Sequence, residues 1–237
     1  MSKKPGESMS RIIAFDVNET LLDLAALDPL FEDIFGAASV RREWFSQVLQ
    51  SAMVTTIFGQ YQDFGTIAGH ALSQMGERHG VRLTQKNRDA VSGGLRSLPP
   101  HSDVQPALRR LADSGMRLIA LTNSPPQVAR AQLENAELAG FFEDIFSVDA
   151  AQTLKPAPEV YNTAARSLLA SAQEMRLVAA HAWDVAGAMN AGWHGAFVAR
   201  PGQVLDPLFP APDIVGSDLG EVADQILVKD TGGGDEA

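Results

Sequence analysis

The stretch RIIAFDVNETL, residues 11–21, decides how the rest of the chain is interpreted. Residues 11–15 form a largely apolar run, which is typical of a buried strand, and Asp16 follows directly where that strand would emerge. A carboxylate at the end of a buried strand can be held rigidly while one oxygen attacks an electrophile. A single aspartate at such a place more often caps the following turn, so its interpretation depends on the remainder of the chain.

Further strands are expected along the chain, separated by segments whose apolar residues recur at helical spacing. The predicted strands cover residues 116–121, 145–148, 177–180, 197–198 and 214–215. The predicted helices between them cover residues 104–114, 126–137, 158–169 and 185–191. Strands that alternate with helices indicate an α/β fold with a parallel sheet covered on both faces. Ligands bind such sheets at the carboxyl ends of the strands, so function is expected there.

A long segment after the first strand interrupts this alternation. Residues 22–98 contain no convincing strand, and residues 43–58 and 66–79 have the clearest amphipathic helical patterns. A helical block at this place in the chain predicts a cap over the ends of the strands. The predicted divisions are a flexible N-terminal extension at 1–10, a core domain at 11–21 and 99–228, a helical cap domain at 22–98 and a flexible tail at 229–237.

The composition limits the partners that the chain can have. Its formal net charge of −10 argues against a nucleic acid partner and against binding to anionic membranes. A small-molecule anionic substrate would need a locally positive pocket. The chain has no cysteine, so thiolate chemistry and disulfides are excluded, and no apolar run has the length of a membrane span or the form of a signal peptide. We therefore expect a cytoplasmic protein.

Polar residues follow three further predicted strands. Residues 122–124, Thr-Asn-Ser, offer a hydroxyl, an amide and backbone N–H groups that can bind an anion, although such a triplet also commonly caps a helix. Lys155 follows the third strand and could place a positive charge beside Asp16, whereas most lysines are solvated at the surface. Residues 181–184, His-Ala-Trp-Asp, add an imidazole, an aromatic ring and a second carboxylate after the fourth strand.

Polar clusters in the order Asp, Thr, Lys, Asp at the ends of successive strands resemble the four signature motifs of the haloacid dehalogenase superfamily. The resemblance extends from residue 11 to about residue 226 and implies a Rossmann-like core with a helical cap inserted after the first strand. Within the superfamily the closest resemblance is to the type II, or L-2-haloacid, dehalogenases. It is carried by LTNSP at 121–125, SVD at 147–149, KP at 155–156, VY at 160–161, AWD at 182–184 and YQDF at 61–64.

The resemblance implies a mechanism in which Asp16 displaces halide from C2 of a small 2-haloalkanoic acid and forms an ester. Water then attacks the carbonyl of Asp16 and releases a 2-hydroxy acid of inverted configuration, and no cofactor or metal is implied. In this scheme Lys155 holds Asp16 ionised, and Asp184 orients Lys155. Thr20 and Thr122 would support the nucleophile through hydrogen bonds.

The resemblance also implies which residues bind the substrate. Asn123 and backbone amides would clamp its carboxylate, while Phe64 and Trp183 would form a dry wall around the reacting carbon, although each is as often simply part of a core. The expected substrate-binding residues are Val17, Asn18, Phe45, Phe64, Asn123, Ser124 and Trp183. Because relatives with this cap are often dimeric, a homodimer is also expected.

Two departures from the dehalogenase pattern concern the leaving group. Phe45 stands where well-matched members carry an arginine that helps to accept the departing halide. Arg41 and Arg42 lie one helical turn earlier and could replace it, but a solvated surface role is expected for both. His181 stands where those enzymes tend to have asparagine, and its imidazole could deprotonate the attacking water, donate to a leaving group or make a structural hydrogen bond.

Two alternatives to dehalogenation remain open. A phosphatase of a small phosphorylated metabolite would need magnesium, and usually a second aspartate two positions after the nucleophile, where this chain has Asn18. Only Asp184 would accompany Asp16 as a carboxylate ligand, which is a poor set for a hard cation. The chain could also be a catalytically altered member of the family that serves binding or assembly, with Phe45 and residues 179–180 as signs of lost chemistry.

Overall fold

The computed structural model describes residues 12–231, and its centre is a six-stranded parallel sheet with the strand order β3-β2-β1-β4-β5-β6. The strands are β1 (Ile12–Phe15), β2 (Arg117–Thr122), β3 (Asp144–Ser147), β4 (Met175–Ala179), β5 (His194–Val198) and β6 (Ile214–Gly216). Each predicted strand is present, and the parallel pairing confirms the α/β class. The predicted extension at 1–10 and residue 11 lie outside the described residues.

β1 occupies the middle of the sheet because its residues are apolar on both faces. All four of its side chains are at most 2% exposed, as expected for a strand that helices cover on each side. Ala14 pairs with Ile119 of β2 on one side and with Leu177 of β4 on the other. This register brings the residues that follow β1, β2 and β4 to the same edge of the sheet.

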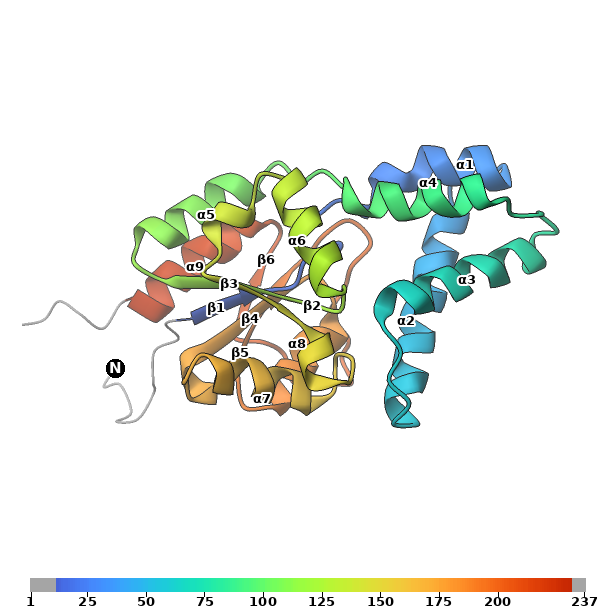
Figure 1. Cartoon of the computed structure of the whole chain (residues 1–237). Helices are drawn as coiled ribbons and strands as arrows, with labels where there is room; N and C mark the ends of the chain where they lie inside the picture. Colours follow the sequence, from blue (N-terminus) through green and yellow to red (C-terminus); the bar gives the residue numbers. More distant parts are fainter. Residues whose placement is uncertain (1–11, 232–237) are drawn as a thin grey trace, which may run out of the picture.

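Helices cover both faces of the sheet (Figure 1). On one face lie α5 (Val104–Asp113), α6 (Pro126–Asn135) and α9 (Leu219–Thr231), and on the other lie α7 (Pro158–Ser167) and α8 (Ala182–Asn190). α8 begins at Ala182 rather than at residue 185. α9 continues to Thr231, so residues 229–231 of the predicted flexible tail are helical, and residues 232–237 lie outside the described residues. No helix in the described part of the chain is long and apolar enough to span a lipid bilayer.

A helical block lies between β1 and α5 in the chain. It comprises α1 (Asp28–Phe35), α2 (Val40–Ile57), α3 (Phe64–Arg78) and α4 (Gln85–Arg96). Figure 1 shows the block to the right of the sheet, on the side toward which β1 points. α2 and α3 correspond to the helices predicted at 43–58 and 66–79, which confirms a helical cap inserted after the first strand. The exact domain boundaries at 22 and 98 stay a prediction.

Aromatic packing and hydrogen bonds hold the helical block together and connect it to the sheet. The rings of Phe31 and Trp44 lie 5.3 Å apart. Nε1 of Trp44 donates to the backbone oxygen of Ala68 at 3.0 Å and so joins α2 to α3. Tyr61 donates a hydrogen bond to Asp149, which follows β3, and this contact ties the block to the edge of the sheet where polar residues gather.

A buried arginine fastens the last helix to the sheet. Arg176 of β4 is 1% exposed, and its guanidinium lies 2.7 Å from Asp230 of α9 and 2.7 Å from Asp213, which precedes β6. A buried charge is costly unless partners compensate it. The arginine and its two carboxylates therefore stabilise one another only as a set.

We expect Arg176→Met to lower the free energy of unfolding by about 3–5 kcal/mol, because Asp230 would stay buried without its cation. Urea unfolding measures the difference. The matched control is Arg110→Met, which removes an exposed pair with Asp224 and should cost at most about 1 kcal/mol. Equal losses in the two variants would contradict the role given to the buried set.

Candidate functional site

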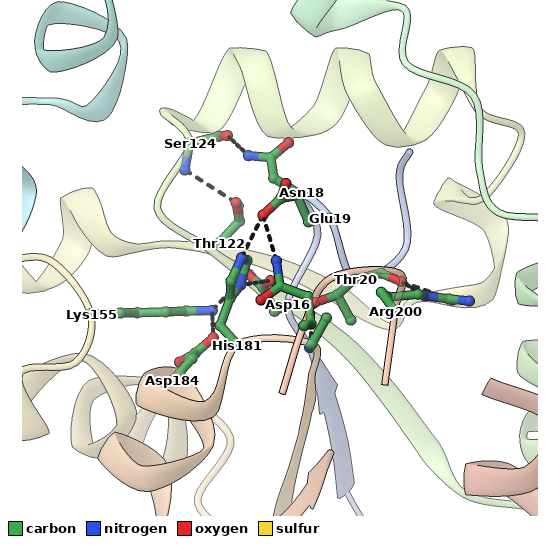
Figure 2. A network of polar contacts seen from close by, with 12 residues as sticks. Asp16, Asn18, Glu19, Thr20, Thr122, Ser124, Lys155, His181, Asp184 and Arg200 are labelled. Atoms are coloured by element: carbon green, nitrogen blue, oxygen red, sulfur yellow. Dashed lines mark hydrogen bonds and ion pairs between the residues drawn. The ribbon is translucent and has the colours of Figure 1, made fainter. Parts of the chain in front are cut away.

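A buried lysine joins two carboxylates at the carboxyl edge of the sheet (Figure 2). Asp16 follows β1, Lys155 lies in the loop between η3 (Val148–Ala151) and α7, and Asp184 lies in the first turn of α8. Nζ of Lys155 is 3.1 Å from Oδ1 of Asp16 and 2.8 Å from Oδ2 of Asp184. The Lys155 side chain is fully buried, so the alternative of a solvated surface lysine is wrong.

The Asp16 carboxylate is held in its ionised form. Burial alone would raise the pKa of Asp16, but Lys155 and His181 outweigh burial and hold that pKa below its ordinary value. Oγ1 of Thr20 donates to Oδ2 of Asp16 at 2.7 Å and accepts from the backbone N–H of Ala180 at 2.9 Å. An anionic carboxylate with hydrogen bonds to both oxygens is a nucleophile of defined orientation.

Lys155 and Asp184 are positioned by further hydrogen bonds. Oη of Tyr161 donates to Oδ1 of Asp184 at 2.6 Å, and the side-chain oxygen of Asn123 accepts from the backbone N–H of Lys155 at 3.0 Å. Burial lowers the pKa of Lys155, but Asp16 and Asp184 raise it to a value above the ordinary one, so the ammonium persists at neutral pH. Burial and the charge of Asp16 raise the pKa of Asp184 against the opposing effect of Lys155.

Some of the predicted site residues are not arranged as expected. The side chain of Val17 is fully buried in the core, and Val17 is not among the residues that line the two clefts described below. Oγ1 of Thr122 accepts from the backbone N–H of Ser124 at 3.1 Å, and among the described residues it makes no hydrogen bond with Asp16, so its predicted support of the nucleophile is absent. Nδ2 of Asn18 donates to Oγ of Ser124 at 3.2 Å, which joins two predicted substrate-binding residues.

His181 lies between two carboxylates. Its Nε2 is 2.9 Å from Oε2 of Glu19, and its Nδ1 is 3.3 Å from Oδ2 of Asp16. Ionised carboxylates only accept hydrogen bonds, so both ring nitrogens must donate and the ring is an imidazolium cation. Burial lowers the pKa of His181, but the hydrogen bonds to Asp16 and Glu19 raise it to about 10. While Asp16 is a free carboxylate, the protonated ring cannot take a proton from water, and the catalytic role of His181 stays a prediction.

Glu19 is a residue of this network that sequence reasoning missed. It has a φ of 61°, accepts from Nε2 of Gln203 at 3.2 Å, and lies 3.6 Å from Nη1 of Arg41. Arg41 is only 4% exposed, so the surface role expected for it is wrong, whereas Arg42 is exposed as expected. A glutamate in a short polar loop gives no sequence signal for these contacts, since its partners lie in distant segments.

Two clefts flank the network. The polar cleft has a volume of about 490 Å³ and is lined by residues that include Glu19, Arg41, Arg42, Phe45, His181 and Trp183. The apolar cleft has a volume of about 600 Å³ and is lined by residues that include Asn18, Phe45, Val48, Phe64, Leu72 and Ser124. Phe45 lines both clefts, so its ring marks the boundary between them.

The three predicted aromatic residues therefore have different surroundings. Phe64 belongs to the apolar cleft, and Trp183 belongs to the polar cleft. Trp183 stacks on His181 with ring centroids 5.2 Å apart, and the ring of Phe45 lies 6.3 Å from His181. The imidazolium is thus in contact with two aromatic rings, an arrangement that favours a cation.

The groups around Asp16 do not suit a divalent cation. Lys155 lies between Asp16 and Asp184, the two carboxylates that a magnesium ion would need, and His181 adds a second positive charge. Over residues 12–231, no group of three or more His, Cys, Asp or Glu side chains is arranged to hold a metal ion. The independence from a metal stays a prediction.

The chain matches the family of haloacid dehalogenase-like hydrolases over residues 11–192. It is 25% identical over 217 residues to an (S)-2-haloacid dehalogenase of Pseudomonas putida, and the aligned region covers 91% of this chain and 97% of that relative. It is 28% identical over 203 residues to an (S)-2-haloacid dehalogenase of Pseudomonas sp. (strain YL), and the aligned region covers 85% of this chain and 88% of that relative. The solved structure of L-2-haloacid dehalogenase from Xanthobacter autotrophicus shares the fold, with a TM-score of 0.86 and 24% identity over 92% of this chain and 98% of that chain.

The family match and the geometry concern the same part of the molecule. Asp16, Lys155 and Asp184 all lie within the matched residues 11–192, as do the helical block and β1 to β4. A parallel sheet with a helical cap and a buried Asp-Lys-Asp cluster at its carboxyl edge is what the sequence motifs imply. The chain belongs to the family of haloacid dehalogenase-like hydrolases.

Proposed function

We propose that the protein is a hydrolytic dehalogenase that converts small 2-haloalkanoic acids to 2-hydroxy acids through a covalent ester on Asp16. The observation that carries the proposal is the buried ammonium of Lys155, 3.1 Å from Asp16 and 2.8 Å from Asp184. It keeps Asp16 anionic in a place from which water is largely excluded, as a carboxylate nucleophile requires. The relatives named as (S)-2-haloacid dehalogenases support the choice of substrate class.

In the first step an oxygen of Asp16 attacks C2 of the haloacid from the side opposite the halogen. A carbon–oxygen bond forms, the carbon–halogen bond breaks, and its electron pair leaves with the halide. The substrate carboxylate needs hydrogen-bond donors to hold it for in-line attack. Asn123 can provide its side-chain NH₂ group, since its oxygen is already used by the backbone of Lys155.

In the second step water attacks Cγ of the Asp16 ester. The oxygen of the water stays in the Asp16 carboxylate, and the alkyl group leaves with the oxygen that made the first attack, which takes up one proton of the water and becomes the hydroxyl group. The water must lose a proton during this step. Asp184 is the other carboxylate of the Asp-Lys-Asp cluster, and we assign it as the acceptor of that proton.

The fate of the water oxygen tests this scheme directly. In a single turnover in heavy-oxygen water with enzyme in excess, we expect the label in the peptide that contains Asp16 and not in the hydroxy acid. Mass spectrometry of both products is the measurement.

Asp16→Asn should lower halide release by at least about 1000-fold, with deamidation excluded by mass. Label in the hydroxy acid that is formed in this single turnover would disprove the ester.

The role of Lys155 is tested by Lys155→Met. We expect kcat for halide release, measured in the presence of a chelator, to fall by about 100-fold or more, because Asp16 loses the cation that holds it ionised. The matched control is Lys86→Met, which removes an exposed lysine of α4 and should leave kcat unchanged. Circular dichroism checks that both variants are folded, and a folded Lys155→Met variant with the wild-type rate would contradict the proposal.

The pKa of His181, raised to about 10, predicts how stability depends on pH. A group whose pKa is raised on folding stabilises the folded state below its unfolded pKa of 6.5, and this contribution is lost as pH rises through about 10. Urea unfolding of the wild type and of His181→Asn should therefore give a wild-type advantage near neutral pH that shrinks as pH approaches 10. A difference that stays constant over this range would mean that the folded protein holds His181 neutral.

A further inference from the structure

A buried arginine binds the loop that carries the nucleophile, and the proposed reaction gives it no task. Nε and Nη2 of Arg200, which follows β5, donate to the backbone oxygen of Thr20 at 3.1 and 2.9 Å. Thr20 is fully buried and Arg200 is 7% exposed, so water competes little for these hydrogen bonds. Figure 2 shows Arg200 beside Thr20, on the side of the site away from Lys155.

The hydroxyl group of Thr20 is held by different partners from its carbonyl group. The hydroxyl oxygen accepts from the backbone N–H of Ala180 at 2.9 Å, and its single proton is donated to Oδ2 of Asp16 at 2.7 Å. The end of β4 thus orients the side chain of Thr20, while Arg200 fixes its backbone. Because the side chain follows the backbone, a shift of the Thr20 peptide group would carry the hydroxyl away from Asp16.

The same guanidinium group also binds the core helices. Nη1 of Arg200 lies 2.9 and 2.7 Å from the two side-chain oxygens of Asp103, the residue before α5. Oδ2 of Asp103 accepts in turn from the backbone N–H of Leu219, where α9 begins, at 2.6 Å. The planar fork of arginine can bridge a carbonyl group and a carboxylate in this way, whereas the ammonium group of lysine is a single point charge. Arg200 therefore connects the nucleophile loop to α5 and α9.

This bridge lies where the chain enters and leaves the helical block. The backbone N–H of His101, on the returning segment, donates to the backbone oxygen of Leu21, on the outgoing segment, at 3.0 Å. Thr20 directly precedes Leu21, and Asp103 follows shortly after His101. Arg200 thus binds both segments on the core side of their pairing, and it is the side chain that anchors the outgoing segment next to Asp16.

We propose that Arg200 is a positioning residue for the reaction: by holding the carbonyl group of Thr20, it keeps the Thr20 hydroxyl on Asp16. This inference rests on the proposed dehalogenase function and adds no covalent step to it. The orientation of the Asp16 carboxylate, on which in-line attack at C2 depends, is then fixed from the loop after β5 as well as from Lys155.

A direct role of Arg200 in substrate binding fits the contacts less well, although the residue lines the polar cleft. Each of its side-chain nitrogens already donates to Thr20 or to Asp103. Arg176 offers a matched comparison, because it is also buried, at 1% exposed, and is also paired with carboxylates. The carboxylates that Arg176 binds lie before β6 and on α9, so it has no contact with the nucleophile loop.

A double-mutant cycle tests the proposal by kinetics. Arg200→Lys keeps a cation beside Asp103 but cannot bridge it to the carbonyl group of Thr20, and Thr20→Val removes the hydroxyl. We expect each change to lower kcat for halide release by about 10–100-fold and to change KM by at most about threefold, because a misplaced nucleophile loses rate rather than substrate binding. The double variant should be as slow as Thr20→Val to within about threefold, since Arg200 acts through that hydroxyl.

The control and the contrary outcomes are distinct. Arg176→Lys alters a buried arginine away from the nucleophile, so it should lower stability and leave kcat unchanged. Losses of Arg200→Lys and Thr20→Val that multiply in the double variant would mean that Arg200 acts independently of the hydroxyl. A rise in KM with unchanged kcat would mean that Arg200 binds the substrate. Either result, or a wild-type rate in Arg200→Lys, would overturn the proposal.

Hydrogen–deuterium exchange of the intact protein gives a readout that needs no turnover. In Arg200→Lys, the peptide containing residues 16–22 should exchange at least about tenfold faster than in the wild type, while the peptide containing β2 and both peptides in Arg176→Lys should not. Should Arg200→Lys not fold, Asp103→Asn removes the anion that holds the guanidinium and should speed the same exchange. Unchanged exchange at 16–22 would overturn the proposal. A wild-type enzyme inert toward haloacids would count against the dehalogenase function alone.

Discussion

A buried ammonium group sets the geometry of the site, because a charge without access to water has to be compensated by its neighbours. The side chain of Lys155 is fully buried, and its partners are Asp16 after β1 and Asp184 in the first turn of α8. These segments meet because β4, which leads into α8, pairs directly with β1. The strand order of the sheet therefore brings both carboxylates to the buried ammonium group. This electrostatic requirement constrains the segments that carry the three side chains.

The charges of the site alternate from one side to the other. In the order of their contacts they are Asp184, Lys155, Asp16, His181, Glu19 and Arg41, with successive distances of 2.8, 3.1, 3.3, 2.9 and 3.6 Å. Carboxylates and cations are equal in number in this row, although the whole chain has a formal net charge of −10. Neutralising any one carboxylate leaves an excess positive charge, which explains how an acidic protein can accommodate an anion at this place.

The sequence predicts those parts of the molecule that short patterns encode. Apolar runs indicate the strands, and the polar segments that follow three of them contain Asp16, Lys155 and Asp184. The burial of Arg41 and the link from Glu19 to His181 could not be predicted, because they depend on side chains from distant segments that meet only in the folded chain. The protonation of His181 follows from two such contacts. The homodimer, the cytoplasmic location and the domain boundaries stay predictions.

The position of Phe45 on the boundary of the two clefts has a consequence for the order of events. The ring is carried by α2, whereas Asp16 and His181 are carried by segments of the sheet, so the partition exists only while the helical block is seated. Any displacement of α2 that opens a way to the nucleophile also merges the two compartments into a single basin. When the helix returns, the basin is divided into two clefts again. Whether a bound molecule meets one compartment or two is then set by the position of the helix that bears this ring.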